Sequence, residues 1–474
     1  MRRSGFVVLA ILGPAVLCFR APAQSIERAV AAAEALGAHT GVAVCDADGH
    51  VLYRHRATEP MAPASNMKVL TAAAVLHGLG ADYEFKTRFR LRDGRLVVQA
   101  SGDPNWIHET EHAPERVFGN VAAALQRLSV REIAAIDLDP ASFVGPVRPA
   151  TWPQDQLYTY YCAPTGPFVL EQSTLIVGIA AVSGHSAAEV YLIAPTADLP
   201  LRGAIELVDS AKGATYGASD TGDAITVRGR FYRKSPSVSI RTAMRDPAVW
   251  YLASLRQALT KAGITVGNGI AQVGGITGGA AGGPGDTLVY EHKSRLAPAM
   301  LRMLEDSSNF DAEQCLRVLG HHTLGDGSLQ GGLLALEQEV KKQLGQVPEG
   351  IVLADGSGLS RQNRLTAGTL VVALFASCNG PGGAMLRDCL PVSGRSGTLS
   401  GRFTGTNLVG RVRAKTGWIR GASSLSGLVE REDGTRRWFS ILMSYDQKQD
   451  GLNKDLKQLQ EQIVQAIDGT GLER

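Results

Sequence analysis

Three short polar strings, separated by very unequal stretches, constrain this chain more than any other feature. They are Ser65-Asn66-Met67-Lys68, Ser307-Ser308-Asn309 and Lys415-Thr416-Gly417. Each string alone is short enough to arise by chance. Together they offer a serine hydroxyl, a lysine to activate it, and further polar groups to hold a substrate. Such a set supports attack on an amide carbonyl by a serine that a lysine, rather than a histidine, deprotonates. We therefore expect a fold that brings the three strings to one site.

The first string is expected to open a helix, because Pro60 and Pro63 break the chain just before Ser65. Lys68 then lies on the same helix face as Ser65, within side-chain reach. The helix N-terminus offers unpaired N–H groups where an oxyanion would form. A lysine with its ordinary pKa is a poor base at neutral pH, so burial and a second cation, Lys415, are expected to lower the pKa of Lys68. The alternative is a serine cap followed by a surface lysine.

The second string precedes an apolar helix. Ser307 is expected to relay a proton to the departing amine, and Asn309 to hold Lys68 and a substrate carbonyl. The alternative is ordinary helix capping, which is the usual role of serine and asparagine at such positions.

The third string ends a strand pattern. Lys415 and Thr416 can bind a substrate carboxylate through a charge and a hydroxyl. Gly417 would let a substrate backbone lie close to the strand, and the N–H of Trp418 would be the second oxyanion donor beside that of Ser65. The alternative is a charged strand end followed by a turn.

The string His108-Glu109-Thr110-Glu111-His112 has the His-Glu-x-x-His spacing of zinc proteases. It lies between Pro104 and Pro114 without an apolar helix around it, and a zinc site needs a third ligand. We therefore expect no metal and no cofactor. The glycine-rich stretch 274–285 is interpreted as a linker or loop.

Composition indicates an ordinary globular protein that is exported. The 474 residues are 44% hydrophobic and 20% charged. Residues 1–23 resemble a signal peptide, with two arginines, an apolar run and Ala21-Pro22-Ala23. A retained anchor and a lipoprotein signal at Cys18 are the alternatives. Removing residues 1–23 lowers the net charge from +3 to zero, which favours neither nucleic acid nor an anionic membrane as a partner.

Five cysteines follow the predicted signal peptide, so at least one has no partner within the chain. Cys378 and Cys389 flank a glycine-rich turn and are the best candidates for a disulfide in an exported protein. Cys45 lies in an apolar run and is expected to be buried.

Hydrophobic periodicity predicts strands and helices at both ends of the chain and a strand-rich middle. Strands are expected at 40–45, 51–55, 85–91, 96–100, 133–137, 174–180, 188–193, 204–208, 224–228, 237–240, 411–415, 425–429 and 438–444. Helices are expected at 26–36, 66–79, 117–128, 249–262, 296–305, 309–319, 328–343 and 454–467.

The chain resembles the class C low-molecular-mass penicillin-binding proteins, the D-alanyl-D-alanine carboxypeptidase/endopeptidase family. The resemblance rests on the three strings and on the 242-residue gap between the first two, which related carboxypeptidases and β-lactamases keep far shorter. Further strings that resemble the family are Asp355-Gly356-Ser357-Gly358-Leu359-Ser360-Arg361, Ser101-Gly102-Asp103-Pro104, Leu390-Pro391-Val392-Ser393-Gly394 and Gly397-Thr398-Leu399.

The resemblance implies a mixed α/β (α+β) fold: a penicillin-binding transpeptidase-like domain, with an antiparallel sheet between helices, split by two inserted strand-rich domains. The implied boundaries are 24–84 with 286–474 for the catalytic domain, 85–165 with 239–285 for inserted domain II, and 166–238 for inserted domain III.

The resemblance also implies serine carboxypeptidase or endopeptidase activity on peptidoglycan peptides ending in D-Ala-D-Ala, with β-lactams as inhibitors. Arg361 would contact a diaminopimelate-type side-chain end and Asp155 the amino group of the substrate; a surface ion is the alternative for each. A β-lactamase and a non-catalytic wall-binding protein are the alternative functions. The balance of carboxypeptidase and endopeptidase activity and the oligomeric state stay open.

Overall fold

The computed structural model describes residues 26–195, 200–267 and 286–469. The predicted signal peptide and the glycine-rich stretch 274–285 lie outside these ranges. Within them, most predicted helices and strands are confirmed to within a few residues. In the described segments, no helix combines the length and the apolar composition needed to cross a membrane.

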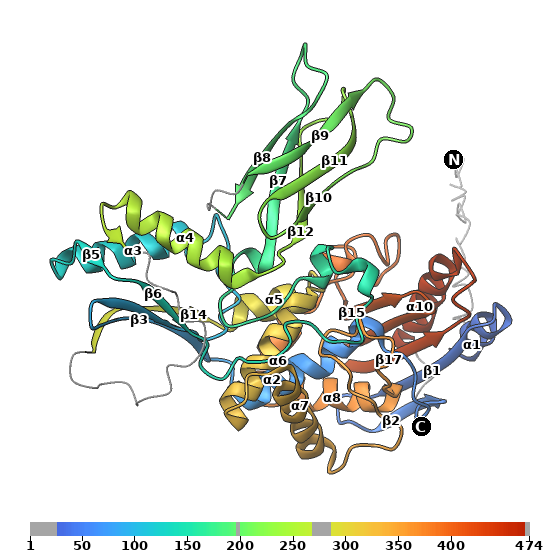
Figure 1. Ribbon diagram of the computed structural model, residues 1–474. Helices are drawn as coiled ribbons and strands as arrows, with labels where there is room; N and C mark the ends of the chain where they lie inside the picture. The colour runs from blue at the N-terminus through green and yellow to red at the C-terminus, as the bar shows by residue number, and fades with distance from the viewer. Residues whose placement is uncertain (1–25, 196–199, 268–285, 470–474) are drawn as a thin grey trace, which may run out of the picture.

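Strands from both ends of the chain form one five-stranded sheet, in the order β15-β16-β17-β1-β2 (Figure 1). All four neighbouring pairs are antiparallel. The strands are β1 (His39–Cys45), β2 (Val51–His55), β15 (Val412–Ile419), β16 (Ala422–Glu430) and β17 (Arg436–Ser444). The N- and C-terminal parts of the chain therefore build the same domain, as the sequence predicts.

Alternating side chains of this sheet enter two separate cores. Val42 and Val44 pack with α1 (Ile26–Ala35) and α10 (Leu452–Asp468) on one face. Ala43 and Cys45 belong to the second core, on the opposite face. That core also contains residues of α2 (Met67–Leu79), α5 (Ala297–Leu304), α6 (Asn309–Leu324), α7 (Leu329–Leu344), α8 (Ala367–Asn379) and α9 (Gly383–Asp388). The sheet thus lies between two helical layers.

Helix α2 is buried along most of its length, from Met67 to Leu76. Its residues are apolar on every side apart from Lys68 and Thr71, which is typical of a helix in the centre of a domain. A short 3-10 turn, Ala64–Asn66, precedes it and holds Ser65. The first string therefore lies at the start of a central helix, which keeps its backbone fixed.

The described residues from Glu84 to Arg295, which lie between the first two strings, form two further parts that extend away from the five-stranded sheet (Figure 1). One contains a four-stranded sheet, β14-β3-β4-β6, and the helices α3 (Pro114–Arg127) and α4 (Pro247–Lys261). Its strands are β3 (Glu84–Arg92), β4 (Arg95–Gln99), β6 (Ile136–Asp139) and β14 (Thr287–Arg295); β5 (Glu132–Ile133) and β13 (Thr265–Val266) pair separately.

Strand β14 differs from the predicted organisation. It follows residue 286 and was expected in the catalytic domain, but it pairs antiparallel with β3. Its nine residues are mostly polar and half-exposed, so periodicity did not predict a strand there. The predicted strand at 133–137 is also divided, because the turn between β5 and β6 interrupts it.

The second inserted part consists of two three-stranded sheets, β12-β7-β8 and β10-β11-β9. Five of its six strands follow the prediction; β10 was missed because its sequence is polar and contains a glycine. The six strands are β7 (Thr174–Ala180), β8 (Glu189–Ala194), β9 (Leu201–Val208), β10 (Tyr216–Asp220), β11 (Ile225–Tyr232) and β12 (Val238–Ala243). We name this part, residues 166–243, the strand-rich insertion.

The predicted disulfide between Cys378 and Cys389 is wrong, because both are free, buried thiols. The turn after α8 continues into helix α9 and does not form a hairpin that would set its two ends opposite each other. Burial raises the pKa of Cys378 to about 12 and that of Cys389 to about 11. The prediction that Cys45 is buried is confirmed.

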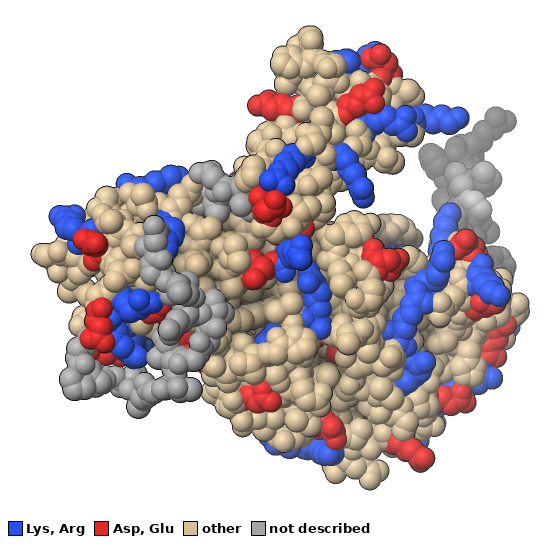
Figure 2. All heavy atoms as spheres, in the orientation of Figure 1, with Lys and Arg blue, Asp and Glu red and all other residues tan. Residues whose placement is uncertain are grey.

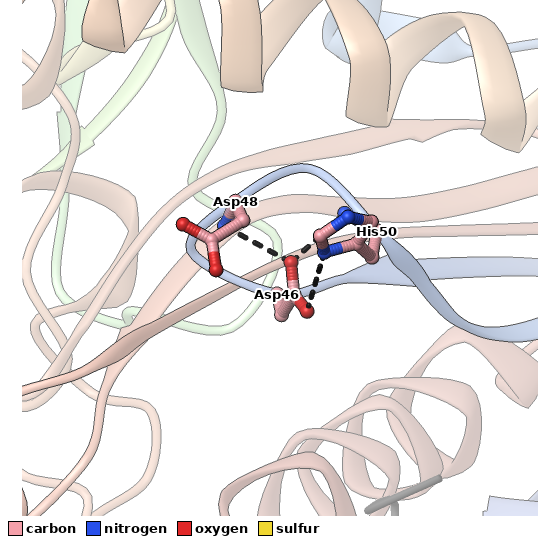
Figure 3. A group of neighbouring side chains, drawn as sticks. All are labelled: Asp46, Asp48 and His50. Atoms are coloured by element: carbon pink, nitrogen blue, oxygen red, sulfur yellow. Dashed lines mark hydrogen bonds and ion pairs between the residues drawn. The ribbon is translucent and has the colours of Figure 1, made fainter.

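The turn between β1 and β2 gathers Asp46, Asp48 and His50 (Figure 3). Their ligand-type atoms lie close enough to hold a cation, but hydrogen bonds explain the arrangement. Asp46 Oδ1 accepts from the backbone N–H groups of Asp48 at 3.0 Å and His50 at 2.8 Å, as aspartate often does in turns. We interpret this cluster as the closure of the hairpin.

Candidate active site

A cleft of about 1220 Å³ lies where the start of α2, the loop before α6 and strand β15 meet. Residues of the first two strings line it, together with the residue that follows the third string: Ser65, Ser307, Ser308, Asn309 and Trp418. Acidic and basic side chains are interspersed on the face of the molecule drawn in Figure 2. The fold thus brings together segments that lie hundreds of residues apart.

Lys68 is fully buried, and its ammonium group contacts three oxygen atoms. Nζ lies 3.1 Å from Ser65 Oγ, 2.7 Å from Asn309 Oδ1 and 2.6 Å from the carbonyl oxygen of Ser357. Burial lowers the pKa of Lys68 to about 7, although Asp355 and Glu313 oppose the shift. A neutral amine donates to two of these oxygens and keeps a lone pair for the Ser65 hydroxyl proton. This geometry suits a general base.

The second string has two different functions in the structure. Ser308 is the N-cap of α6, because its Oγ accepts from Asp311 N at 3.1 Å; the capping alternative therefore holds for this residue. Asn309 is fixed at both ends of its amide, since Oδ1 accepts from Lys68 and Nδ2 donates to Tyr161 O at 2.9 Å. Ser307 has a positive φ of 61°, a strained conformation of the kind found at functional sites.

The third string lies on β15, where Lys415 is fully buried. We expected Lys415 to face the cleft, but its Nζ donates to Thr416 O at 2.9 Å. Burial lowers the pKa of Lys415 well below its ordinary value, and the charge of Lys68 adds to the shift. Burial, rather than Lys415, is the main cause of the lowered Lys68 pKa.

Gly417 allows β15 to pass directly beside the nucleophile. A Cβ at this position would lie 2.2 Å from Ser424 Oγ and 3.0 Å from both Pro63 O and Ser65 N. The need for glycine thus arises from packing within the protein, whereas the sequence suggested close approach by a substrate. Thr416 is half-buried, and its hydroxyl donates to Thr398 Oγ1 at 2.8 Å.

The loop 355–360 and Glu313 complete the site, and the sequence analysis assigned Glu313 no role. Glu313 is fully buried, and its Oε1 accepts from the N–H groups of Gly356 at 2.9 Å and Ser357 at 2.7 Å. Burial, with the charge of Asp355, raises the pKa of Glu313. This carboxyl group therefore places the Ser357 carbonyl that contacts Lys68. The sequence did contain a signal that could have identified Glu313: it follows Asn309 by about one helical turn, in a helix that is otherwise rich in apolar residues.

Arg361 and Asp155 both line the cleft, and both are exposed. The Arg361 guanidinium contacts the side chain of Gln447, and Asp155 lies in the 3-10 turn Gln154–Gln156. Both lie on the exposed rim of the cleft that Ser65 and Trp418 also line, and their contacts with a substrate stay a prediction.

The His-Glu-x-x-His string forms turns before α3, so its two histidines do not share a helix face. His108 is engaged by the buried Glu171, whose Oε2 lies 2.7 Å from His108 Nδ1. The His112 ring packs against His292, with ring centres 5.2 Å apart. The string therefore lacks the helical geometry of a zinc protease.

Known proteins are similar to this chain over most of its length. Residues 23–467 match the model of the D-Ala-D-Ala carboxypeptidase 3 (S13) family. The D-alanyl-D-alanine carboxypeptidase of Actinomadura sp. (strain R39) is 32% identical over 425 residues, which cover 84% of this chain and 76% of that protein. The D-alanyl-D-alanine carboxypeptidase DacB of Haemophilus influenzae is 24% identical over 395 residues, 79% of each chain.

The fold of this chain is also similar to that of a solved relative. A crystal structure of penicillin binding protein 4 (dacB) from Haemophilus influenzae superposes with a TM-score of 0.75 at 22% identity, covering 91% of this chain and 97% of that one. A complex of that protein with a β-lactam gives a TM-score of 0.73. The chain belongs to the S13 family of serine D-Ala-D-Ala carboxypeptidases, the class C low-molecular-mass penicillin-binding proteins.

Proposed function

We propose that Ser65 is the residue acylated in this D-Ala-D-Ala carboxypeptidase, with Lys68 as its general base. One observation carries the assignment: the buried Lys68 amine, with its pKa lowered to about 7, lies 3.1 Å from Ser65 Oγ at the floor of the cleft. The substrates are peptidoglycan peptides that end in D-Ala-D-Ala, which the family implies.

The proposed acylation begins with proton transfer from Ser65 to Lys68 and ends with release of the terminal D-alanine. Lys68 takes the Ser65 hydroxyl proton while Oγ attacks the carbonyl of the penultimate D-alanine. The oxyanion is stabilised by the N–H groups of Ser65 and Trp418, each worth about 3 kcal/mol of barrier. Ser307 then relays a proton to the nitrogen of the departing D-alanine. Asn309 holds Lys68 throughout, and water later cleaves the ester.

Substrate orientation is assigned to the third string and the rim. Thr416 and the positive charge of Lys415 would hold the terminal carboxylate from the strand side, while Arg361 and Asp155 contact the side chain and amino end of the peptide. A crosslinked peptide presents the same D-alanyl carbonyl with a different leaving amine. Turnover of a free pentapeptide beside a crosslinked muropeptide measures the balance between the two activities.

A β-lactam can acylate the same serine because it, too, presents an amide carbonyl to the nucleophile, in this case within a strained ring. The related Haemophilus influenzae protein has been crystallised with a β-lactam. We propose slow release of this acyl group; rapid nitrocefin turnover would instead favour the β-lactamase alternative.

The proposed location is the periplasm or cell-wall space, reached after cleavage of residues 1–23. N-terminal sequencing of the protein recovered from its native cells tests this: a mature chain that begins near Gln24 is expected, and an intact Met1 would contradict export by cleavage.

Incubation with fluorescent penicillin, followed by digestion and peptide mapping, tests the nucleophile. We expect the label on the peptide that contains Ser65. No label, or a label on another peptide, would refute the assignment.

A further inference from the structure

The cleft extends past the three strings to the strand-rich insertion. Gln172, Thr174 and Arg241 line that side of it. Gln172 lies in the turn before β7 and Arg241 lies on β12, the strand that pairs with β7. The acyl-transfer steps assign no role to these three residues.

The turn that carries Gln172 has an unusual backbone. Glu171, Gln172 and Ser173 have positive φ values of 53°, 55° and 54°. Residues other than glycine rarely adopt this left-handed conformation, and successive ones even less often, because Cβ approaches the following carbonyl oxygen. Such strain persists only where the surroundings hold it, and it is concentrated at functional sites.

The buried Glu171 side chain holds this turn in place. Its carboxylate accepts from the backbone N–H and the ring Nδ1 of His108, both at 2.7 Å. The backbone adds two bonds, from Glu171 N to Trp106 O at 2.8 Å and from Met244 N to Ser173 O at 2.8 Å. Burial raises the pKa of Glu171, and the bonds from His108 oppose that shift. His108, the first histidine of the His-Glu-x-x-His string, thus anchors the turn.

The turn places Gln172 against the second string. Its Nε2 donates to Ser308 Oγ at 3.2 Å and also to the carboxylate of Asp311. On its other side, Gln172 Oε1 lies 3.5 Å from Arg241 Nη1, which also lies 3.4 Å from Thr174 Oγ1. Through Gln172 the insertion therefore contacts the N-cap of α6 within the second string, and it presents Arg241 on the lining of the same cleft.

Among the described arginines that line the cleft, Arg241 and Arg361 form no salt bridge, whereas the other two do. Arg302 is paired with Asp311 at 2.6 Å and Arg420 with Asp450 at 3.2 Å. Arg241 is exposed, and within the described ranges no carboxylate forms a salt bridge with it. Its two contacts are long and come from a single nitrogen of the guanidinium group.

We propose that Arg241, oriented by Gln172 and Thr174, forms a subsite that binds a carboxylate of the peptide upstream of the cleaved bond. The hydrogen-bond partners of Arg241 are neutral, and the charge of the buried Glu171 acts on it without a salt bridge. Such a guanidinium group can bind a planar carboxylate with two parallel hydrogen bonds. The subsite rests on the proposed function, because it assumes that a peptide occupies the cleft. It assigns the strand-rich insertion a role in choosing the substrate.

The test uses two synthetic peptides that end in D-Ala-D-Ala and differ at one upstream glutamate, which carries either a free α-carboxylate or its amide. We expect the wild-type enzyme to prefer the carboxylate peptide by roughly 3- to 20-fold in kcat/KM, through KM, because a charge-assisted contact is weakened by solvent. In Arg241→Gln this preference should fall to about one, and Arg241→Lys should keep part of it.

The matched control is Arg228→Gln, an exposed arginine on β11 that does not line the cleft; it should keep the wild-type preference. The proposal is overturned if the wild-type enzyme does not distinguish the peptides, if Arg241→Gln keeps the preference, or if that variant loses activity equally on both peptides. Penicillin labelling of Ser65 in the wild-type protein separates the two hypotheses. No label refutes the proposed function, whereas a label without a carboxylate preference refutes the subsite alone.

Discussion

The floor and the rim of the cleft are built in opposite ways. At the floor, Lys68 is fully buried and makes three hydrogen bonds. At the rim, Arg361 is exposed and Trp418 is 56% exposed. Groups held before the substrate arrives need no reorganisation during the reaction, whereas exposed groups adapt to different peptides. We therefore propose that the floor determines the reaction and the rim selects the substrate.

The largest effect is expected at the centre of the floor. Lys68→Met removes the base but keeps an apolar side chain of similar length in the buried space. Acylation by penicillin should fall by about 10³-fold or more, as for other residues that act as a unit with a nucleophile. Stopped-flow labelling measures the rate. A loss of less than tenfold would show that another group deprotonates Ser65.

The next effect is expected where β15 passes the nucleophile. Gly417→Ala would place a Cβ 3.0 Å from Ser65 N and 2.2 Å from Ser424 Oγ. A displacement of the nucleophile by about 1 Å costs about 100-fold in rate. Adding Ser424→Ala removes the closest contact, so the double variant should recover part of the loss. Full activity of Gly417→Ala would indicate that the strand yields without moving Ser65.

Glu313 tests whether the loop that contacts Lys68 must be held in place. Glu313→Ala leaves two buried N–H groups without an acceptor and frees the loop that holds Lys68, so acylation should fall about 10- to 100-fold. Glu313→Gln keeps an oxygen acceptor and should lose much less. Glu337→Ala, which removes a partner of Lys341 on the surface of α7, is the control. Equal losses in both Glu313 variants would favour a role for the charge over the acceptor.

The pH dependence of acylation tests how the two lysines interact. Because the pKa of Lys68 is about 7, acylation should rise with pH and reach half its maximum near pH 7, as Lys68 loses its proton. Lys415→Ala removes a neighbouring positive charge, which raises the pKa of Lys68 and moves the rising limb to higher pH. An unshifted profile would show that burial alone sets the Lys68 pKa.

The smallest effect is expected at the rim. Arg361→Gln should raise KM for a diaminopimelate-type peptide by roughly 3- to 10-fold, because an exposed ionic contact contributes little. Penicillin acylation provides the internal comparison, since this small reagent need not reach the rim. A large loss of kcat would place Arg361 among the groups of the floor.

The sequence predicted the floor better than the rim, for a physical reason. Ser65 and Lys68 are joined by helix geometry, so their proximity follows from spacing alone. The catalytic sheet was predictable because its central strands, β1, β16 and β17, are buried on both faces and flanked by clear turns. Strands β10 and β14 were missed because they are polar and half-exposed, and the disulfide was wrong because turn residues do not reveal that a helix follows.

By itself, the sequence determined which residues are the candidates for the chemistry and the order in which the chain supplies them. Only the tertiary structure decided that Lys415 is buried, that Gly417 borders Ser65, and that Glu313 positions the carbonyl on Lys68. It also decided that Gln172 and Arg241 meet the cleft. These relations join segments between about 40 and 350 residues apart in the chain, and their contacts arise from packing, which neither local propensity nor periodicity encodes.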